Sequence, residues 1–266
     1  MLFTSEVLIL LVLTLGVCAI GFKKYVWFIS IGYGLSISVI AIGMLVMFGS
    51  DMSFWSILYG IIMTCYGFRL GGYLAYREIK TSYNASMKGE ISDGSNMSFG
   101  VKIALWISCG LLYIMMMAPM IYRGVNMADS NAWEIIGMIV SVLGILLEAT
   151  ADAQKNKAKK ADPKKFVSTG LFRIVRCPNY LGELIIWTGM FLTAFGGLDS
   201  FGQWLVAIIG YLGIVYIMFS GARRLEIRQD KNYGELPEYQ AYKNATPIML
   251  PFVPLYSVKK HKWLVG

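Results

Sequence analysis

Charged side chains are scarce in this sequence: only 15% of its 266 residues are Asp, Glu, Lys or Arg, while 56% are hydrophobic. This balance excludes an ordinary soluble domain, in which charged residues make up about a quarter of the chain. Histidine occurs once, as His261, and the four cysteines are scattered, most of them within apolar runs. Because there is no C-x-x-C pair and no His/Cys cluster, we expect neither a disulfide framework nor a metal site.

Glycine-rich phosphate-binding motifs are also absent. The sequence contains no G-x-G-x-x-G and no P-loop lysine, so any nucleotide is expected to bind outside those folds. The net charge of +8 does not indicate nucleic acid binding, because the basic residues lie in loops between apolar runs. The N-terminus lacks the basic region of a cleavable signal peptide, so residues 6–22 are predicted to persist as a first membrane span.

Long apolar runs, by contrast, fill most of the chain. Each is close to the ~20 residues that cross a bilayer core as a helix, the open-chain element that satisfies its own backbone in lipid. We therefore predict an all-α, multi-pass integral membrane protein with a single membrane domain over residues 1–266. The predicted spans are 5–22, 25–49, 53–76, 101–122, 132–152, 181–198 and 200–220.

Lysine and arginine alternate between loops. They cluster after the first, third and fifth predicted spans and in the C-terminal tail, whereas the fourth loop carries only Arg123. Since positive charge marks cytoplasmic loops, the N-terminus is predicted outside and the C-terminus inside. Residues 81–100, rich in Gly, Ser and Asn, are predicted to form a linker or lid. Residues 223–246 have helical character that Pro237 must interrupt or restart, and prolines punctuate the end of the chain.

Several charged residues lie within or beside the predicted spans, where they are costly and usually face a cavity or a partner. Arg69 follows Tyr66 on the third span, Glu148 and Asp152 share one face of the fifth, and Glu183 opens the sixth. The alternative is that these charges pair with one another or extend into the headgroup region.

The loop after the fifth span carries most of the basic residues. Lys155 and Lys159 continue the face of Glu148 and Asp152, which gives acceptors for sugar or amide groups followed by cations for phosphates. Gly170 and the nearby arginines can add further phosphate donors. The row suits an elongated nucleotide. The alternative is that the basic run only fixes topology and contacts anionic lipid.

Two motifs carry a family resemblance. The segment GLFRIVRCPNYLGELIIW is similar to the G-L-W-x-x-x-R-H-P-N-Y-x-G-E signature of the steroid 5-alpha-reductase-like membrane reductases, the DUF1295 type. The preceding LLEATADAQKNKAKKADP resembles their E-x-x-A-D-x-Q-K segment. The resemblance extends over residues 60–255, because it also includes the third span YGFRLGGYLAYRE and the tyrosine-bearing tail that ends in MLPF. Residues 1–60 are expected to form N-terminal spans that vary within the family.

The resemblance implies seven transmembrane helices, an NADPH in a cytoplasm-facing cavity and a lipophilic substrate that enters from the bilayer. It further implies hydride transfer to an activated C=C, with Tyr66 as proton donor. Apart from the substrate, the expected partners are membrane lipids. We infer neither a nucleic acid partner nor an obligate protein partner. The residues expected to hold the cofactor are Arg69, Glu148, Asp152, Lys155, Lys159, Arg173, Arg176, Asn179, Tyr180, Glu183, Arg224, Glu226 and Tyr242.

Two departures from the family pattern concern the reaction. Cys177 stands where the family has histidine, so any role for an imidazole is lost. Residues 25–49 contain no carboxylate, although steroid reductases use a glutamine–glutamate pair there to polarise the ketone. Two alternatives remain: an S-adenosylmethionine-dependent methyltransferase of the isoprenylcysteine or phospholipid type, which shares the R-x-P-N-Y turn, and a non-catalytic membrane protein.

Overall fold

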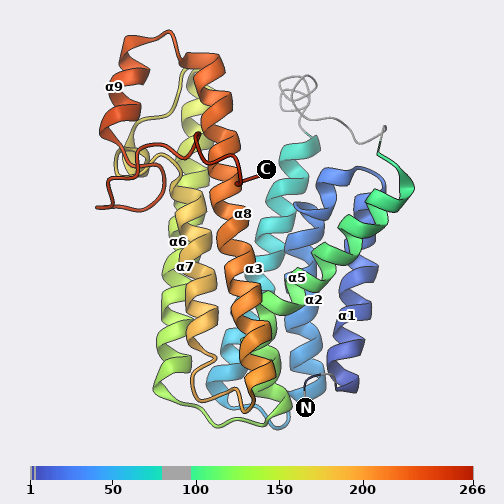
Figure 1. Cartoon of the computed structure of the whole chain (residues 1–266). Helices are drawn as coiled ribbons and strands as arrows, with labels where there is room; N and C mark the ends of the chain where they lie inside the picture. The colour runs from blue at the N-terminus through green and yellow to red at the C-terminus, as the bar shows by residue number, and fades with distance from the viewer. Residues whose placement is uncertain (1, 3, 80–96, 266) are drawn as a thin grey trace. The chain divides into compact units, whose positions relative to one another are not determined.

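The computed structural model describes residues 2, 4–79 and 97–265, and within these ranges all regular secondary structure is helical (Figure 1). The predicted linker or lid at 81–100 lies mostly outside the described residues. The long helices are α1 (Ser5–Cys18), α2 (Ile31–Phe48), α3 (Phe54–Ile79), α5 (Phe99–Val125), α6 (Ala132–Ala161), α7 (Pro178–Leu192), α8 (Phe201–Tyr233) and α9 (Pro237–Ala245). Three short 3-10 helices are η1 (Ala19–Phe22), η2 (Tyr25–Phe28) and η3 (Gly170–Arg173).

Five segments of the described chain are long and apolar enough to cross a membrane. They are Ser5–Phe22, Tyr25–Phe48, Phe99–Val125, Ala132–Ala161 and Phe201–Tyr233. These five agree with predicted spans, and the all-α class is confirmed for the described residues. The remaining two predicted spans correspond to α3 and α7, so the count of seven and the orientation stay predictions.

The boundaries of α7 and α8 differ from those expected. The span predicted at 181–198 begins earlier, at Pro178, because proline suits the first helical position, and it ends at Leu192 in a turn where Gly196 has φ +73°. The span predicted at 200–220 continues without a break to Tyr233 as α8. Pro237 opens α9, which is one of the two outcomes expected for it.

The described residues form two compact units. Unit 1 comprises 1–138 and 190–210, and unit 2 comprises 139–189 and 211–266. In unit 1, α2 and α3 pack backbone against backbone: a Cβ on Gly34 would lie 2.8 Å from the carbonyl oxygen of Gly67. Small residues at such crossings are typical of membrane helices, which pack by close van der Waals contact.

Unit 2 uses the same device to join α6 to α7. A Cβ on Gly182 would lie 2.7 Å from the backbone nitrogen of Glu148, and one on Gly144 would lie 2.7 Å from the carbonyl oxygen of Gly182. The Ser141 hydroxyl donates a hydrogen bond to the carbonyl oxygen of Ile186 at 2.8 Å. This close crossing brings the glycine of the P-N-Y-L-G-E motif directly against Glu148.

Candidate functional site

The α6–α7 crossing in unit 2 gathers several of the predicted site residues. Glu148 and Asp152 are 2% and 8% exposed, one turn apart on α6. Asn179 and Glu183 lie one turn apart at the start of α7, on either side of Gly182 in sequence, and both are half-buried. The α6–α7 crossing therefore brings two buried carboxylates of one helix face close to the start of α7.

Tyr180 belongs to the same end of α7. A Cβ on Gly221 of α8 would lie 3.4 Å from the phenol ring of Tyr180, which is ordinary van der Waals contact. The Tyr180 ring therefore packs on α8 within unit 2. Arg224, one turn further along α8, is exposed.

Lys159 occupies a different position from the one expected of a phosphate ligand. Its ammonium group donates to the carbonyl oxygens of Pro163 and Lys165 at 3.0 and 2.7 Å, and to the Tyr233 hydroxyl at 3.0 Å. An ammonium has three donors, so these contacts use all of them. In this structure Lys159 closes the loop after α6. Lys155, which is also half-buried, is nearer to Glu148 and Asp152 along the sequence of α6.

Arg176 and Glu226 form a buried ion pair rather than an open ligand site. The Arg176 guanidinium lies 3.2 Å from the Glu226 carboxylate, and neither side chain is accessible to solvent. Arg176 also donates to the carbonyl oxygen of Tyr256, and Glu226 accepts from the backbone N–H of Val258 at 2.9 Å. The pair therefore fastens the segment after α9 to α8.

Cys177, which replaces the family histidine, is completely buried beside this pair. Burial raises the pKa of its thiol to about 12, and the nearby positive charges of Arg176 and Lys155 offset this only partly. Its backbone N–H donates to the carbonyl oxygen of Ile248 at 2.9 Å. Cys177 is thus a neutral packing residue that holds the α7 entry turn against the tail.

The turn before α7 depends on Gly170 and Gln154. Gly170 has φ +62°, a conformation that favours glycine, and a Cβ there would lie 2.8 Å from the Gln154 side-chain carbon Cδ. The Gln154 side-chain amide oxygen accepts a hydrogen bond from the backbone N–H of Leu171 at 2.9 Å. These contacts anchor η3 to α6 and leave the Arg173 side chain exposed.

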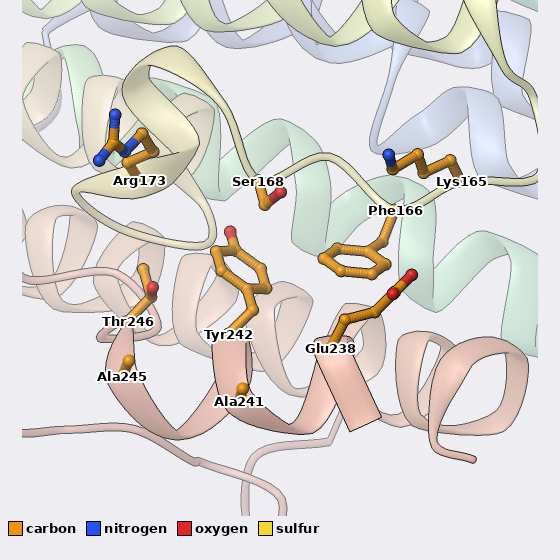
Figure 2. Close-up of a pocket in the computed structure, with 9 residues that line it drawn as sticks. All are labelled: Lys165, Phe166, Ser168, Arg173, Glu238, Ala241, Tyr242, Ala245 and Thr246. Atoms are coloured by element: carbon orange, nitrogen blue, oxygen red, sulfur yellow. The ribbon is translucent and has the colours of Figure 1, made fainter. Parts of the chain in front are cut away.

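A pocket of about 540 Å³ lies in unit 2 between this turn and α9. Figure 2 shows Phe166 and Tyr242 between Lys165 at one end and Arg173 at the other. The rings of Phe166 and Tyr242 stack with centroids 5.5 Å apart, and the Tyr242 hydroxyl donates to the carbonyl oxygen of Phe172 at 2.7 Å. Burial raises the pKa of Tyr242, so its phenol stays protonated and can act as this donor. The lining residues are Lys165, Phe166, Ser168, Arg173, Glu238, Ala241, Tyr242, Ala245 and Thr246.

Tyr66 and Arg69 belong to unit 1. Tyr66 is 1% exposed on α3, and the guanidinium carbon of Arg69 lies 5.7 Å from the centre of its ring. A cation over an aromatic face is attracted by the ring quadrupole. The sequence places the two residues one helical turn apart, and in the structure the guanidinium lies over the ring.

Comparison with known protein families supports the resemblance that the sequence motifs indicate. The family model DUF1295, described as "Protein of unknown function (DUF1295)", matches residues 19–246. The chain belongs to the DUF1295 family. The predicted kinship with the steroid 5-alpha-reductase-like proteins is thereby confirmed.

Two relatives of this DUF1295 protein are informative. An uncharacterized protein of Schizosaccharomyces pombe is 27% identical over 167 residues, covering 55% of this chain and 45% of the relative. Steroid 5-alpha-reductase DET2 of Arabidopsis thaliana is 25% identical over 122 residues, covering 45% of this chain and 41% of the relative. The matched regions thus span less than half the length of each relative. No solved structure matches the chain.

Reading the motifs alone missed several residues of the DUF1295 fold that shape the site. Gln154 anchors the Gly170 turn, Gly182 sets the α6–α7 distance, and Phe166 stacks on Tyr242. Two of these carried a usable signal, because Gln154 and Gly182 stand inside the family motifs quoted above. Phe166 carried none, since its partner follows 76 residues later in a separate helix.

Proposed function

We propose that this DUF1295 protein is a membrane oxidoreductase that uses NADPH to reduce an activated C=C of a lipophilic, steroid-, sterol- or isoprenoid-like substrate. The observation that supports it best is the α6–α7 crossing, where Gly182 lies against Glu148 in the motif pair resembling the reductases. The 25% identity over 122 residues to a steroid 5-alpha-reductase points in the same direction.

The residues present fit a dinucleotide. Carboxylates such as Glu148 and Asp152 can accept hydrogen bonds from ribose hydroxyls and from a carboxamide, and Asn179 can both donate and accept. Lys155 and Arg173 are proposed as cations for the phosphates. Lys159 and Arg176 already bind groups within unit 2, so a phosphate would have to compete with these contacts.

The remaining expected residues divide by what they contact. Arg69 lies over Tyr66, Tyr180 packs on α8, and Tyr242 holds the η3 turn. Glu183 is proposed to accept a hydrogen bond from the cofactor, and Arg224 to cover it from the exposed face of α8. Glu226 supports them indirectly by holding the tail.

The chemistry assigned to the chain itself is polarisation and proton supply. NADPH, when bound, supplies the hydride for the β-carbon of an enone. Tyr66 is proposed to donate a hydrogen bond to the carbonyl oxygen, to stabilise the negative charge that develops there and then to transfer its proton to the enolate, after which the phenolate would regain a proton from water. The products are the saturated ketone and the oxidised cofactor.

The proposed topology has seven spans, with α3 and α7 crossing the membrane together with the five long apolar helices. The N-terminus lies outside, and the carboxylates of α6 and the basic loop after it face the cytoplasm, where NADPH is available. The basic loop after the fifth span supports this orientation.

Thermal unfolding of the purified chain in detergent tests the proposal. NADPH is expected to raise the Tm, because a ligand that binds the native state stabilises it, and S-adenosylmethionine is expected to leave it unchanged. Asp152→Ala or Asn179→Ala should abolish the NADPH shift, whereas Lys164→Ala, at an exposed lysine outside the crossing, should preserve it. A shift with S-adenosylmethionine alone would favour the methyltransferase instead, and no shift with either would remove both.

A further inference from the structure

The segment 258–265 runs back along α8 instead of leaving the protein surface. It begins beside the buried Glu226 and ends beside Tyr216, ten residues nearer the start of α8 (Figure 1). The contacts are Val258 N–H to the Glu226 carboxylate at 2.9 Å, Arg223 Nε to the Lys259 carbonyl at 3.2 Å, Arg223 to the Leu264 carbonyl at 3.2 Å, Tyr216 hydroxyl to the Trp263 carbonyl at 2.9 Å, and Val265 N–H to the Tyr216 hydroxyl at 3.1 Å.

This path descends from the charged part of α8 into its apolar part. The first charged residue of α8 is Arg223, and Tyr216 lies seven residues before it, or about 10 Å along the helix axis. Trp263 therefore lies at the level of apolar helix, next to the point where the charges begin. Tryptophan and tyrosine are enriched at this depth, the boundary between headgroups and acyl chains.

The side chains of the segment divide into two sets. Leu264 is 2% exposed and packs inward, while Trp263 and Val265 are 65% and 73% exposed. The Tyr216 and Trp263 rings lie 6.0 Å apart, which holds the indole at the surface of α8. An exposed indole and an exposed valine on either side of an inward leucine form an outward apolar edge.

Positive charge surrounds this edge. Lys259, Lys260 and Lys262 are all exposed, and the sequence from 247 to 266 contains no Asp or Glu. Lys259 lies 2.9 Å from Asp230, and this hydrogen bond raises the pKa of Lys259, so it stays charged. Basic residues beside exposed aromatic and apolar ones complement a negatively charged lipid surface.

We propose that residues 258–265 form an interfacial anchor that docks on the anionic phospholipid surface of the leaflet at the charged end of α8. Trp263 and Val265 enter the acyl boundary, and Lys260 and Lys262 contact phosphate groups. The segment lies beyond residues 19–246 that the family model matches. Since Val258 and Glu226 join the tail to α8, lipid binding also holds the Arg176–Glu226 pair in place.

Hydrogen exchange of the full chain in lipid nanodiscs tests the anchor. Amides of 258–265 are expected to exchange more slowly in discs containing phosphatidylglycerol than in discs of phosphatidylcholine alone, and added salt should remove the difference. Lys262→Gln should speed their exchange about fivefold in the anionic discs, the effect of losing one basic contact near such a surface. Lys231→Gln, at an exposed lysine on α8, is the matched control and should change nothing there.

Equal exchange rates of residues 258–265 in the two kinds of disc would overturn the proposal. This comparison uses the unmodified chain, so it does not depend on whether a variant folds. Equal effects of Lys231→Gln and Lys262→Gln would overturn it as well, because the protection would then follow overall charge. Protection that appears only when discs hold two copies of the chain would show that a second copy, not lipid, covers the segment.

Discussion

Two buried ion pairs, one in each unit, use the same chemistry over very different spans of sequence. In unit 1 the Arg123 guanidinium lies 3.1 Å from the Glu134 carboxylate, eleven residues away, and also donates to the carbonyl oxygen of Asp129 at 2.6 Å. In unit 2 Arg176 pairs with Glu226, fifty residues away. The first pair closes the turn between α5 and α6. The second joins the R-x-P-N-Y turn, α8 and the tail.

Further charged residues connect the unit 2 pair to α9 and to the tail. Lys243 of α9 lies 3.5 Å from Glu226 and 2.7 Å from Asp230, which in turn pairs with Lys259 of the tail. Three segments are therefore held by one charge network. A buried pair contributes little net stability but leaves a costly charge when one partner is removed. The difference between the pairs lies in how much structure depends on them.

Removing the acid of each pair should give the largest effects. Glu226→Ala and Glu134→Ala each leave a buried arginine without its carboxylate, and each is expected to lower the free energy of unfolding by about 3–5 kcal/mol. Only Glu226→Ala should also free the tail. Amide exchange of residues 256–265 and the Tm, both measured in detergent, check this. Release of the tail by Glu134→Ala as well would mean that the two pairs do not differ in reach.

Tyr66→Phe should come next, and it asks whether chemistry and cofactor binding belong to different units. Turnover is expected to fall about a hundredfold, the lower end of the contribution of a positioned acid, because the phenol proton is lost. NADPH-induced stabilisation should remain. NADPH oxidation with a panel of lipophilic enones provides the rate, and Tyr59→Phe, a buried tyrosine two turns earlier on α3, is the control. Unaltered turnover would remove Tyr66 as the donor.

Gly182→Ala is expected to cost about 1–3 kcal/mol of stability, because its Cβ would meet the backbone of Glu148, which cannot move aside. Gly72→Ala in unit 1 is the matched control. A Cβ there meets nothing within 4 Å, and alanine is the better helix former, so stability should stay the same or rise slightly. Equal losses from both changes would contradict the close α6–α7 crossing. Chemical unfolding of the two variants in detergent measures the difference.

Sequence patterns predicted the helices more completely than the contacts among charges. Hydropathy located α1, α2, α5, α6 and α8, because a helix that crosses a bilayer needs a minimum length and an apolar composition, and both are visible in the sequence. Helical spacing likewise placed Arg69 one turn after Tyr66 and predicted that Glu148 and Asp152 share a face. These relations are local, and the period of the helix determines them.

Contacts between distant segments were not predictable in this way. The position of Lys159 on the Glu148 face suggested a phosphate ligand, but nothing in the spacing revealed Tyr233, 74 residues away, as its partner. Arg176 was expected among the phosphate donors near Gly170, and Glu226 near the cofactor through the family resemblance, but nothing in the sequence revealed that the two pair with each other and hold the tail. A pattern gives the face on which a charge lies, while its partner depends on the tertiary fold. The cofactor roles themselves stay predictions.

The smallest effect, nil at neutral pH, concerns Cys177 beside the unit 2 pair. Burial raises the pKa of its thiol to about 12, whereas an unfolded chain has a cysteine pKa near 8.5. Between these values the folded state keeps a proton that the unfolded state releases, so stability is full below about pH 8.5 and falls as the pH rises towards 12. Cys177→Ser should reduce this slope by up to about 1.4 kcal/mol per pH unit, measured by chemical unfolding from pH 8 to pH 10.5. An unchanged slope would mean that the thiol reaches water, and that the turn before α7 opens more readily than its backbone bonds to the tail suggest.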